Sequence, residues 1–310
     1  MIRISLENFQ TREEWLELRR SGIGGSDASV IAGVNKYRSV TELWLEKTGK
    51  TDMSEEESEA IYWGNTLEEV IRQEFGKRSG MVATKPPYMY RSEEHPCMIA
   101  NLDGEVEDEI YGTCIFEAKT VSAYKKDEWD NGIPIEYYLQ LQHYMAVTHY
   151  KGAYIAALIG GNEFTYRFIE HSEETIEMLI EMELDFWENV GDNVPPDLDG
   201  SDAAKKYLAN TYPRATKKGA IDLGEVGEVL VEQYDEICAQ EDHVKEMKQY
   251  VENQLKSLLK DNESGLAGNR RVNWTNVSSH RLDTKRLKVD EPELYDQYVS
   301  ITTSRRFSVA

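Results

Sequence analysis

The stretch "IANLDGEVEDEIYGTCIFEAKTV", residues 99–121, has Asp103 in its first extended run and a Glu-x-Lys triplet in its second. Asp103 precedes a glycine and stands fourteen residues before Glu117, a separation that suits two adjacent antiparallel strands joined by a turn. Residues two apart in a strand project from the same face, so Glu117 and Lys119 should point together into a cleft.

A third carboxylate lies in the helix that we expect over residues 58–78. Glu68 follows a stripe with spacings of three and four residues, which should face the core. The other members of this stripe are Ile61, Gly64, Ile71 and Phe75. A carboxylate in such a stripe needs a partner to be stable there. The alternative is a slightly rotated helix that exposes Glu68 to solvent.

These four side chains suit metal-assisted cleavage of a phosphodiester. Carboxylate oxygens bind hard divalent cations, which stabilise the attacking and leaving oxygens, and a lysine can steer and help deprotonate the attacking water. Simpler interpretations stay open: a surface ion pair for Glu117 and Lys119, and an ordinary Asp-Gly turn at Asp103. If the residues converge in space, the protein is a nuclease.

Two further groups are candidates for supporting roles. Gln140 and Tyr144 lie four apart in a helix expected over residues 135–149, so they share a face and could hold the lysine, the water or a DNA backbone. Without that context, such a pair is helix surface or core rim.

An anion site is the second candidate. Arg19 and Arg20 precede the Gly24-Gly25-Ser26 turn, where Ser26 is expected to cap a short helix ending at Gly33. Free N–H groups, a hydroxyl and a guanidinium suit a phosphate. The alternative is a plain capped helix with an exposed arginine.

Composition and charge limit the class of protein and its compartment. The chain has 310 residues, 40% of them hydrophobic, and a net charge of -22, which argues against a generic DNA-binding surface without excluding a basic groove. Three widely spaced cysteines indicate a reducing compartment, and the six histidines show no ligand spacing. Because neither an apolar signal core nor a membrane-spanning run is visible, we expect a cytoplasmic protein.

The pattern divides the chain into four parts. Residues 1–200 are expected to form the main domain, and residues 201–221, rich in Asp, Gly, Pro and Lys, a connecting region. Residues 222–262 predict a long, charged helical arm with an apolar edge. Residues 263–310 predict a small C-terminal α/β subdomain, in which strands surround a short helix.

Taken together, residues 12–190 resemble the YqaJ-like viral recombinase family, which is related to lambda exonuclease and belongs to the PD-(D/E)XK nuclease superfamily. Five segments in order support the resemblance. They are "LRRSGIGGSDASVIAGVNKYRSVTELW", "YWGNTLEEVIRQEF", "MIANLDGEV", "FEAKTVSAYKKDEW" and "IPIEYYLQLQHYMAVT".

The resemblance implies an α/β (α+β) core, a central mixed β-sheet flanked by helices, here followed by the helical arm and small extension. It implies that Asp103, Glu117 and the Ala118 carbonyl bind Mg²⁺, with Mn²⁺ a substitute, and that Glu68 completes the shell. Lys119 would position the water with support from Gln140. Arg19 and Ser26 match positions that grip a 5′-phosphate, with Arg20 as the alternative arginine.

The implied activity is 5′-to-3′ digestion of linear double-stranded DNA by a phage or prophage enzyme in the bacterial host cytosol. It leaves 3′ single strands for a RecT- or Bet-like single-strand annealing protein, and a homo-oligomer is expected. Two alternatives stay open. The protein could be an endonuclease or single-strand nuclease, or a non-catalytic recombination scaffold.

Overall fold

The computed structural model describes residues 1–8, 11–51, 58–130, 132–215, 219–300 and 305–309. The chain divides into two compact units, Met1–Leu208 and Ala209–Ala310. All residues that the sequence nominates for the site lie in the first unit. Among the described residues, no helix is both long and apolar enough to span a membrane.

A five-stranded mixed sheet organises the first unit. Its order is β2-β5-β6-β7-β8, formed by Ala83–Thr84, Gly104–Asp108, Gly112–Val121, Gly152–Ile159 and Glu163–Glu170. Strands β6 and β7 are parallel, while the other neighbours are antiparallel. The chain between β6 and β7 includes helix α6, Ile135–Thr148, as a parallel pair requires. The mixed sheet flanked by helices is the predicted fold class.

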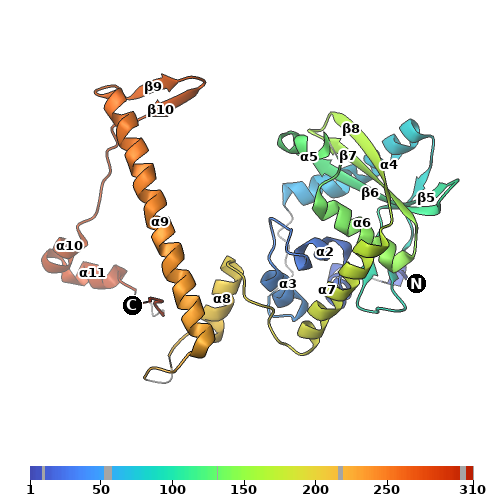
Figure 1. The fold of residues 1–310 in the computed structure, drawn as a ribbon, viewed down its shortest axis with the longest axis horizontal. Helices are drawn as coiled ribbons and strands as arrows, with labels where there is room; N and C mark the ends of the chain where they lie inside the picture. The colour runs from blue at the N-terminus through green and yellow to red at the C-terminus, as the bar shows by residue number, and fades with distance from the viewer. Residues whose placement is uncertain (9–10, 52–57, 131, 216–218, 301–304, 310) are drawn as a thin grey trace. The chain divides into compact units, whose positions relative to one another are not determined.

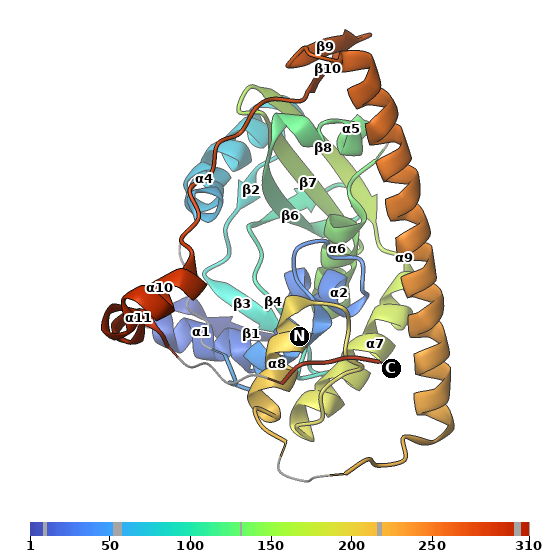
Figure 2. The same ribbon diagram turned by 90° about the vertical axis from the view of Figure 1, so that its left-hand side faces the viewer.

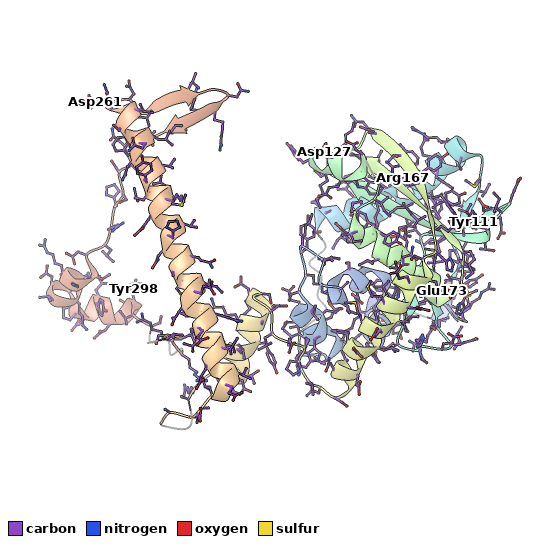
Figure 3. The ribbon with its side chains drawn as sticks, viewed as in Figure 1. Tyr111, Asp127, Arg167, Glu173, Asp261 and Tyr298 are labelled. Atoms are coloured by element: carbon purple, nitrogen blue, oxygen red, sulfur yellow. The ribbon has the colours of Figure 1, made fainter. Side chains whose placement is uncertain are left out.

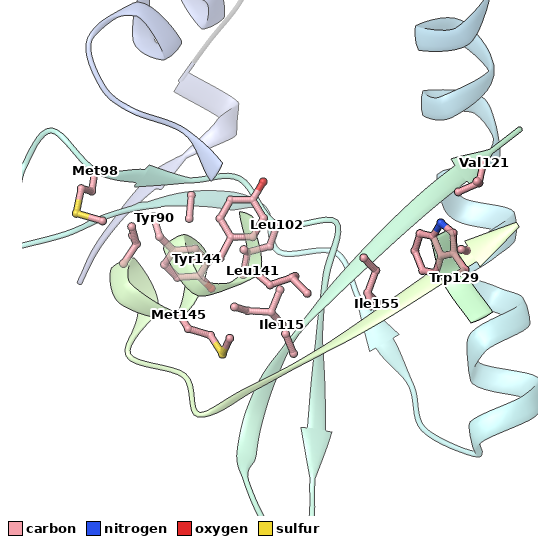
Figure 4. Close-up of a cluster of buried hydrophobic side chains, with 14 of the residues drawn as sticks. Tyr90, Met98, Leu102, Ile115, Val121, Trp129, Leu141, Tyr144, Met145 and Ile155 are labelled. Carbon is pink, nitrogen blue, oxygen red and sulfur yellow. The ribbon is translucent and has the colours of Figure 1, made fainter. Parts of the chain in front are cut away.

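The two faces of this sheet are covered by different helices (Figures 1 and 2). Helix α4, Glu59–Ser79, buries Ile71 and Phe75 against Phe116 and its neighbours on one face. On the other face, Ile115 and its neighbours on β7 pack against the apolar residues of α6 (Figure 4). Alternation along β6 therefore sends Glu117 and Lys119 toward α6, and Ala118 toward α4.

Smaller elements complete the first unit. A second sheet joins β1, Ile2–Ser5, to β3, Tyr88–Arg91, and β4, Ile99–Ala100. The helices around it are α1 (Arg12–Arg20), α2 (Gly25–Ile31), α3 (Val40–Lys47) and α7 (Glu173–Gly191). Helix α2 packs on α6 and α7.

The start of α2 differs from the prediction. Its N-cap is Gly24, not Ser26, and the Asp27 carboxylate accepts from the Gly24 N–H at 3.0 Å. Asp27 lies at the third helical position, and its side chain reaches back over the turn to the backbone of the cap residue. Ser26 instead lies in the first turn with its side chain exposed.

The second unit has its own set of elements. Helix α8, Asp202–Thr211, crosses the unit boundary and occupies half of the segment expected to be a connection. Helix α9 spans Gly224–Leu259, where the arm was expected. The hairpin of β9 (Ser264–Ala267) and β10 (Arg270–Asn273) precedes α10, Thr284–Asp290, and α11, Pro292–Tyr298. Residues 301–304 of the expected last strand lie outside the described residues, and 305–309 form no strand.

A buried ion pair joins three elements of the first unit. His143 on α6 contacts the Glu183 carboxylate of α7 at 2.8 Å and the Ile99 carbonyl of β4 at 2.9 Å. Burial alone would lower the pKa of His143, but Glu183, these hydrogen bonds and the charge of Asp27 outweigh it and raise the pKa. Because both ring nitrogens face acceptors, the imidazolium form fits this position.

This pair predicts a pH dependence of stability. A raised folded-state pKa contributes stability that is present below the unfolded value, about 6.5, and is lost as pH rises through the folded value. We expect Glu183→Gln to lower the free energy of unfolding by roughly 1.5–3 kcal/mol at low pH and to flatten this dependence. Denaturant unfolding across neutral pH measures both, and equal pH slopes in the two proteins would contradict the assignment.

Candidate active site

The site forms where the ladder between β5 and β6 ends. Pairing stops at Gly104 and Phe116, and a side chain on Gly104 would approach Phe116 Cβ at 3.2 Å. Just before β5, Asp103 turns its carboxylate to β6, where Oδ2 accepts from the Ala118 N–H at 2.9 Å. The Ala118 carbonyl leaves an extended strand on the same side as its N–H, so it points to this edge too.

Three polar side chains interlock beside that edge. Lys119 Nζ donates to Glu117 Oε1 at 2.7 Å and to Gln140 Oε1 at 3.0 Å. Gln140 Nε2 donates to the same Glu117 oxygen at 2.7 Å and contacts the Tyr144 hydroxyl at 3.0 Å. The strand pair and the helix pair that the sequence nominated therefore meet.

One oxygen in this group has no hydrogen-bond partner among the residues that the structure describes. Glu117 is 3% exposed, and its Oε2 is buried without a hydrogen bond. A buried carboxylate oxygen left this way is costly in free energy unless something else binds it. Glu117 Oε2 is therefore the clearest candidate atom for a cation ligand.

The charged groups around Glu117 shift one another's pKa values. Burial, then the charges of Glu117 and Glu68, raise the pKa of Asp103 well above its ordinary value. For Lys119, burial alone would lower the pKa, but the charges of Glu117 and Asp103 outweigh it and raise the pKa. The site thus holds an excess of negative charge that one ammonium only partly offsets.

Glu68 is near this group but turned toward other partners. It lies on α4 with its side chain 18% exposed, and its Oε1 pairs with Lys85 at 2.7 Å and Arg72 at 3.5 Å. Arg72 also donates to the Asp103 carbonyl at 2.7 Å. Of its predicted stripe, Ile71 and Phe75 are buried, whereas Ile61 is exposed. Glu68 is therefore at the rim of the helix face that packs on the sheet.

The donor types fit a hard divalent cation, although they are not gathered around one point. Within the described ranges, no three His, Cys, Asp or Glu side chains come together as a metal cluster. Repulsion between carboxylates explains the separation, because each acid takes a protein donor as its partner. By their chemistry, Asp103, Glu117 and the Ala118 carbonyl form a donor set that suits such a cation, and Glu68 would have to leave Lys85 to join them.

Comparison with known proteins gives the family. Residues 14–151 match the model of the YqaJ-like viral recombinase domain. The chain is also 41% identical to the uncharacterized protein YqaJ of Bacillus subtilis (strain 168) over 303 residues, 96% of this chain and 94% of that protein. The chain belongs to the YqaJ-like viral recombinase family.

Solved structures of other proteins share the fold of this YqaJ-like chain. The crystal structure of LHK-Exo in complex with dAMP superposes with a TM-score of 0.50 at 19% identity, covering 65% of this chain and 98% of that one. A second structure, of the alkaline exonuclease LHK-Exo from Laribacter hongkongensis, gives a TM-score of 0.49 at 19% identity, covering 64% and 99%. The common architecture is the PD-(D/E)XK fold.

The predicted phosphate-binding residues of this YqaJ-like chain lie at the α1–α2 turn. Burial and the charges of Glu117 and Asp103 raise the pKa of Tyr144 well above its ordinary value, and the charge of Arg19 acts against them. Arg19 is therefore within electrostatic reach of the site. Its guanidinium also stacks over Trp15, at 5.0 Å from the ring centroid. Arg20 Nε is buried without a hydrogen bond, and Ser26 is exposed.

Sequence reasoning missed the residues that fix this turn. Lys47 on α3 is buried, pairs with Asp27 at 2.8 Å, and donates to the carbonyls of Arg19 and Gly22 at 2.9 and 2.7 Å. Lys47 and Arg38 lower the pKa of Asp27 although burial opposes them. The acidic residue directly after "GGS" was the available signal, but its partner lies twenty residues away.

A glycine in the α1–α2 turn packs closely against Tyr144 and Gln140. A Cβ on Gly25 would lie 2.4 Å from Tyr144 Cε1 and 2.9 Å from Gln140 Cγ. Contacts this short do not occur in folded proteins, so the ring and the amide would have to move. The absence of a side chain at position 25 lets α2 pack directly on α6.

We therefore expect Gly25→Ala to destabilise the protein by roughly 1–3 kcal/mol because of overpacking. Gly191→Ala is the matched control, since nothing lies within 4 Å of its Cβ and its φ is not positive. That change should be neutral or stabilising by about 0.5–1 kcal/mol. Denaturant unfolding measures both, and equal effects would show that the close approach to Tyr144 is not a constraint.

Proposed function

We propose that this protein is a divalent-metal-dependent exonuclease that digests linear double-stranded DNA from 5′ ends. One observation is central: a buried Glu117 oxygen without a partner lies in a group with a desolvated Asp103 and an anchored Lys119. Such an arrangement leaves negative charge that a bound cation would neutralise.

Relatives support the proposal. LHK-Exo, which has the same fold, is described as an alkaline exonuclease and has been crystallised with dAMP, a deoxynucleotide. The family is named for viral recombinases. We therefore extend the proposal to a recombination role, in which the remaining 3′ single strand passes to an annealing protein.

In the proposed mechanism, Asp103, Glu117 and the Ala118 carbonyl would hold Mg²⁺ or Mn²⁺, joined by Glu68. When bound, such a cation would stabilise negative charge on the phosphodiester oxygens and would favour the nucleophilic form of water. Lys119 donates hydrogen bonds from Nζ and orients the attacking water beside the phosphate. Gln140 holds the Lys119 ammonium and the Glu117 carboxylate in place, since its amide contacts both.

The end of the DNA would be recognised at the α1–α2 turn. We propose that the Arg19 guanidinium and the Ser26 hydroxyl bind a terminal 5′-phosphate. An arginine matches phosphate oxygens in charge and geometry. The bond from Lys47 to the Arg19 carbonyl would hold this segment in place for the phosphate.

Asp103→Asn tests the metal site, because the amide oxygen can still accept from the Ala118 N–H while the charge is lost. We expect digestion of end-labelled linear duplex to fall by about 10²–10³-fold or more. Glu107→Gln, an exposed carboxylate on the same strand pair, is the matched control and should keep full activity. Unaltered activity in Asp103→Asn, with the fold verified by circular dichroism, would refute the site.

The same assay separates the alternative activities. Removing divalent cations with EDTA should stop digestion by the unmodified protein, and adding Mg²⁺ should restore it. Closed circular duplex should resist, because it has no ends. Cleavage of the circle would indicate an endonuclease, and an absence of any nuclease activity would favour a scaffold.

Arg19→Ala tests end recognition. We expect a loss of about tenfold on 5′-phosphorylated duplex and little change on ends without phosphate, since one charge-assisted contact is removed. Arg20→Ala is the companion variant and should spare this preference. An equal loss on both kinds of end would contradict a phosphate role for Arg19.

A further inference from the structure

The long helix α9 has a seam with a period of seven residues. Aliphatic residues recur at every seventh position from the helix cap onward, and a second set lies three residues after each of these. The first set is Leu223, Leu230, Ile237, Val244, Val251 and Leu258, and the second is Val226, Gln233, Gln240, Met247 and Gln254. With the first set at a and the second at d, this is a heptad pattern over five heptads in which every a position is aliphatic and three of the five d positions are glutamine.

The seam is exposed along its whole length. The six a-position side chains are between 54% and 80% exposed, and Met247 at a d position is 58% exposed. Figure 3 draws the side chains along the α9 ribbon as sticks. Within the second unit, the ring of Phe307 contacts Tyr234 at one flank, and α10 and α11 have only seven residues each. An apolar row about 54 Å long calls for a partner of similar length.

The charges on α9 favour one occupant and one direction. The first nineteen residues, 224–242, contain seven acidic residues and no lysine or arginine. The remaining residues, 243–259, contain three lysines and two glutamates. The second half thus has one more lysine than glutamates. An antiparallel second copy sets this half beside the acidic half, whereas a parallel copy sets the two acidic halves together.

We propose that α9 forms an antiparallel two-stranded coiled coil with α9 of a second copy of this chain. In an antiparallel coiled coil, each a position lies opposite a d position of the other helix. Several alignments of the two helices satisfy this condition. The alignment that overlaps them most fully sets Ile237 opposite Met247 of the other copy. Tyr234 then lies beside Lys248, a favourable cation–π pair. Glu241 faces its own equivalent, and Lys245, which pairs with Glu241 at 2.9 Å, offsets that contact.

The opposite direction is less favourable at the same positions. In a parallel pair, g and e positions of successive heptads meet, so Glu236 faces Glu241 on both sides of the seam. Three glutamines at d positions lower the stability of either arrangement. The dimer should therefore dissociate on dilution, and this pairing does not depend on the proposed nuclease activity.

The full chain with Ile237→Glu and Val244→Glu tests the seam. Light scattering after size exclusion should give twice the 35.6 kDa chain mass for the unmodified protein and a single-chain mass for the variant. The control, Ala239→Glu with Asn253→Glu, adds the same charge at outward c positions and should remain dimeric. An unmodified protein that stays monomeric at the highest loading concentration, or a mass that the seam variant leaves unchanged, would overturn the proposal.

Cross-linking tests the direction. In a Cys238→Ser background, chains with Ile237→Cys and chains with Met247→Cys are mixed and mildly oxidised; Cys97 and Cys114 are buried. We expect the mixed 237–247 disulfide, identified by mass spectrometry of the peptides. Disulfides that join two 237 positions would indicate parallel strands and overturn the antiparallel arrangement.

Discussion

The hydrogen bond from the Ala118 N–H to the Asp103 carboxylate holds the site together. It forms where the β5–β6 ladder ends, so a side chain replaces the backbone acceptor that a longer strand would provide. This contact keeps Asp103 beside Glu117 although both are acidic. The ammonium of Lys119 and the amide of Gln140 donate hydrogen bonds to Glu117, which reduces the repulsion between the two carboxylates.

Local sequence patterns predicted the parts of the site that depend on periodicity. Strand alternation placed Glu117 and Lys119 on one face, and four-residue helical spacing placed Gln140 and Tyr144 on another, and the structure brings the two faces together. The mixed sheet followed from the family resemblance, which the comparisons confirm. The shared faces of the strand pair and of the helix pair depend on a few neighbouring residues, so they can be inferred from spacing.

Contacts between distant segments were beyond that reasoning. At the start of α2, Asp27 pairs with Lys47, and Glu68 pairs with Lys85. No periodic pattern in the sequence links the two members of either pair. A composition rich in Asp, Gly, Pro and Lys also suggested a connection where α8 forms. In each case, the outcome was decided by tertiary pairing, which outweighs local propensity.

The middle position of the Glu-x-Lys triplet contributes to the site through its main chain alone. The Ala118 methyl group faces α4 on the far side of the sheet, where it packs with the Phe116 cluster. Selection on that side chain therefore concerns only the fit to α4. Small apolar replacements at position 118 should therefore be tolerated, whereas the flanking Glu117 and Lys119 are fixed by their hydrogen bonds to each other and to Gln140.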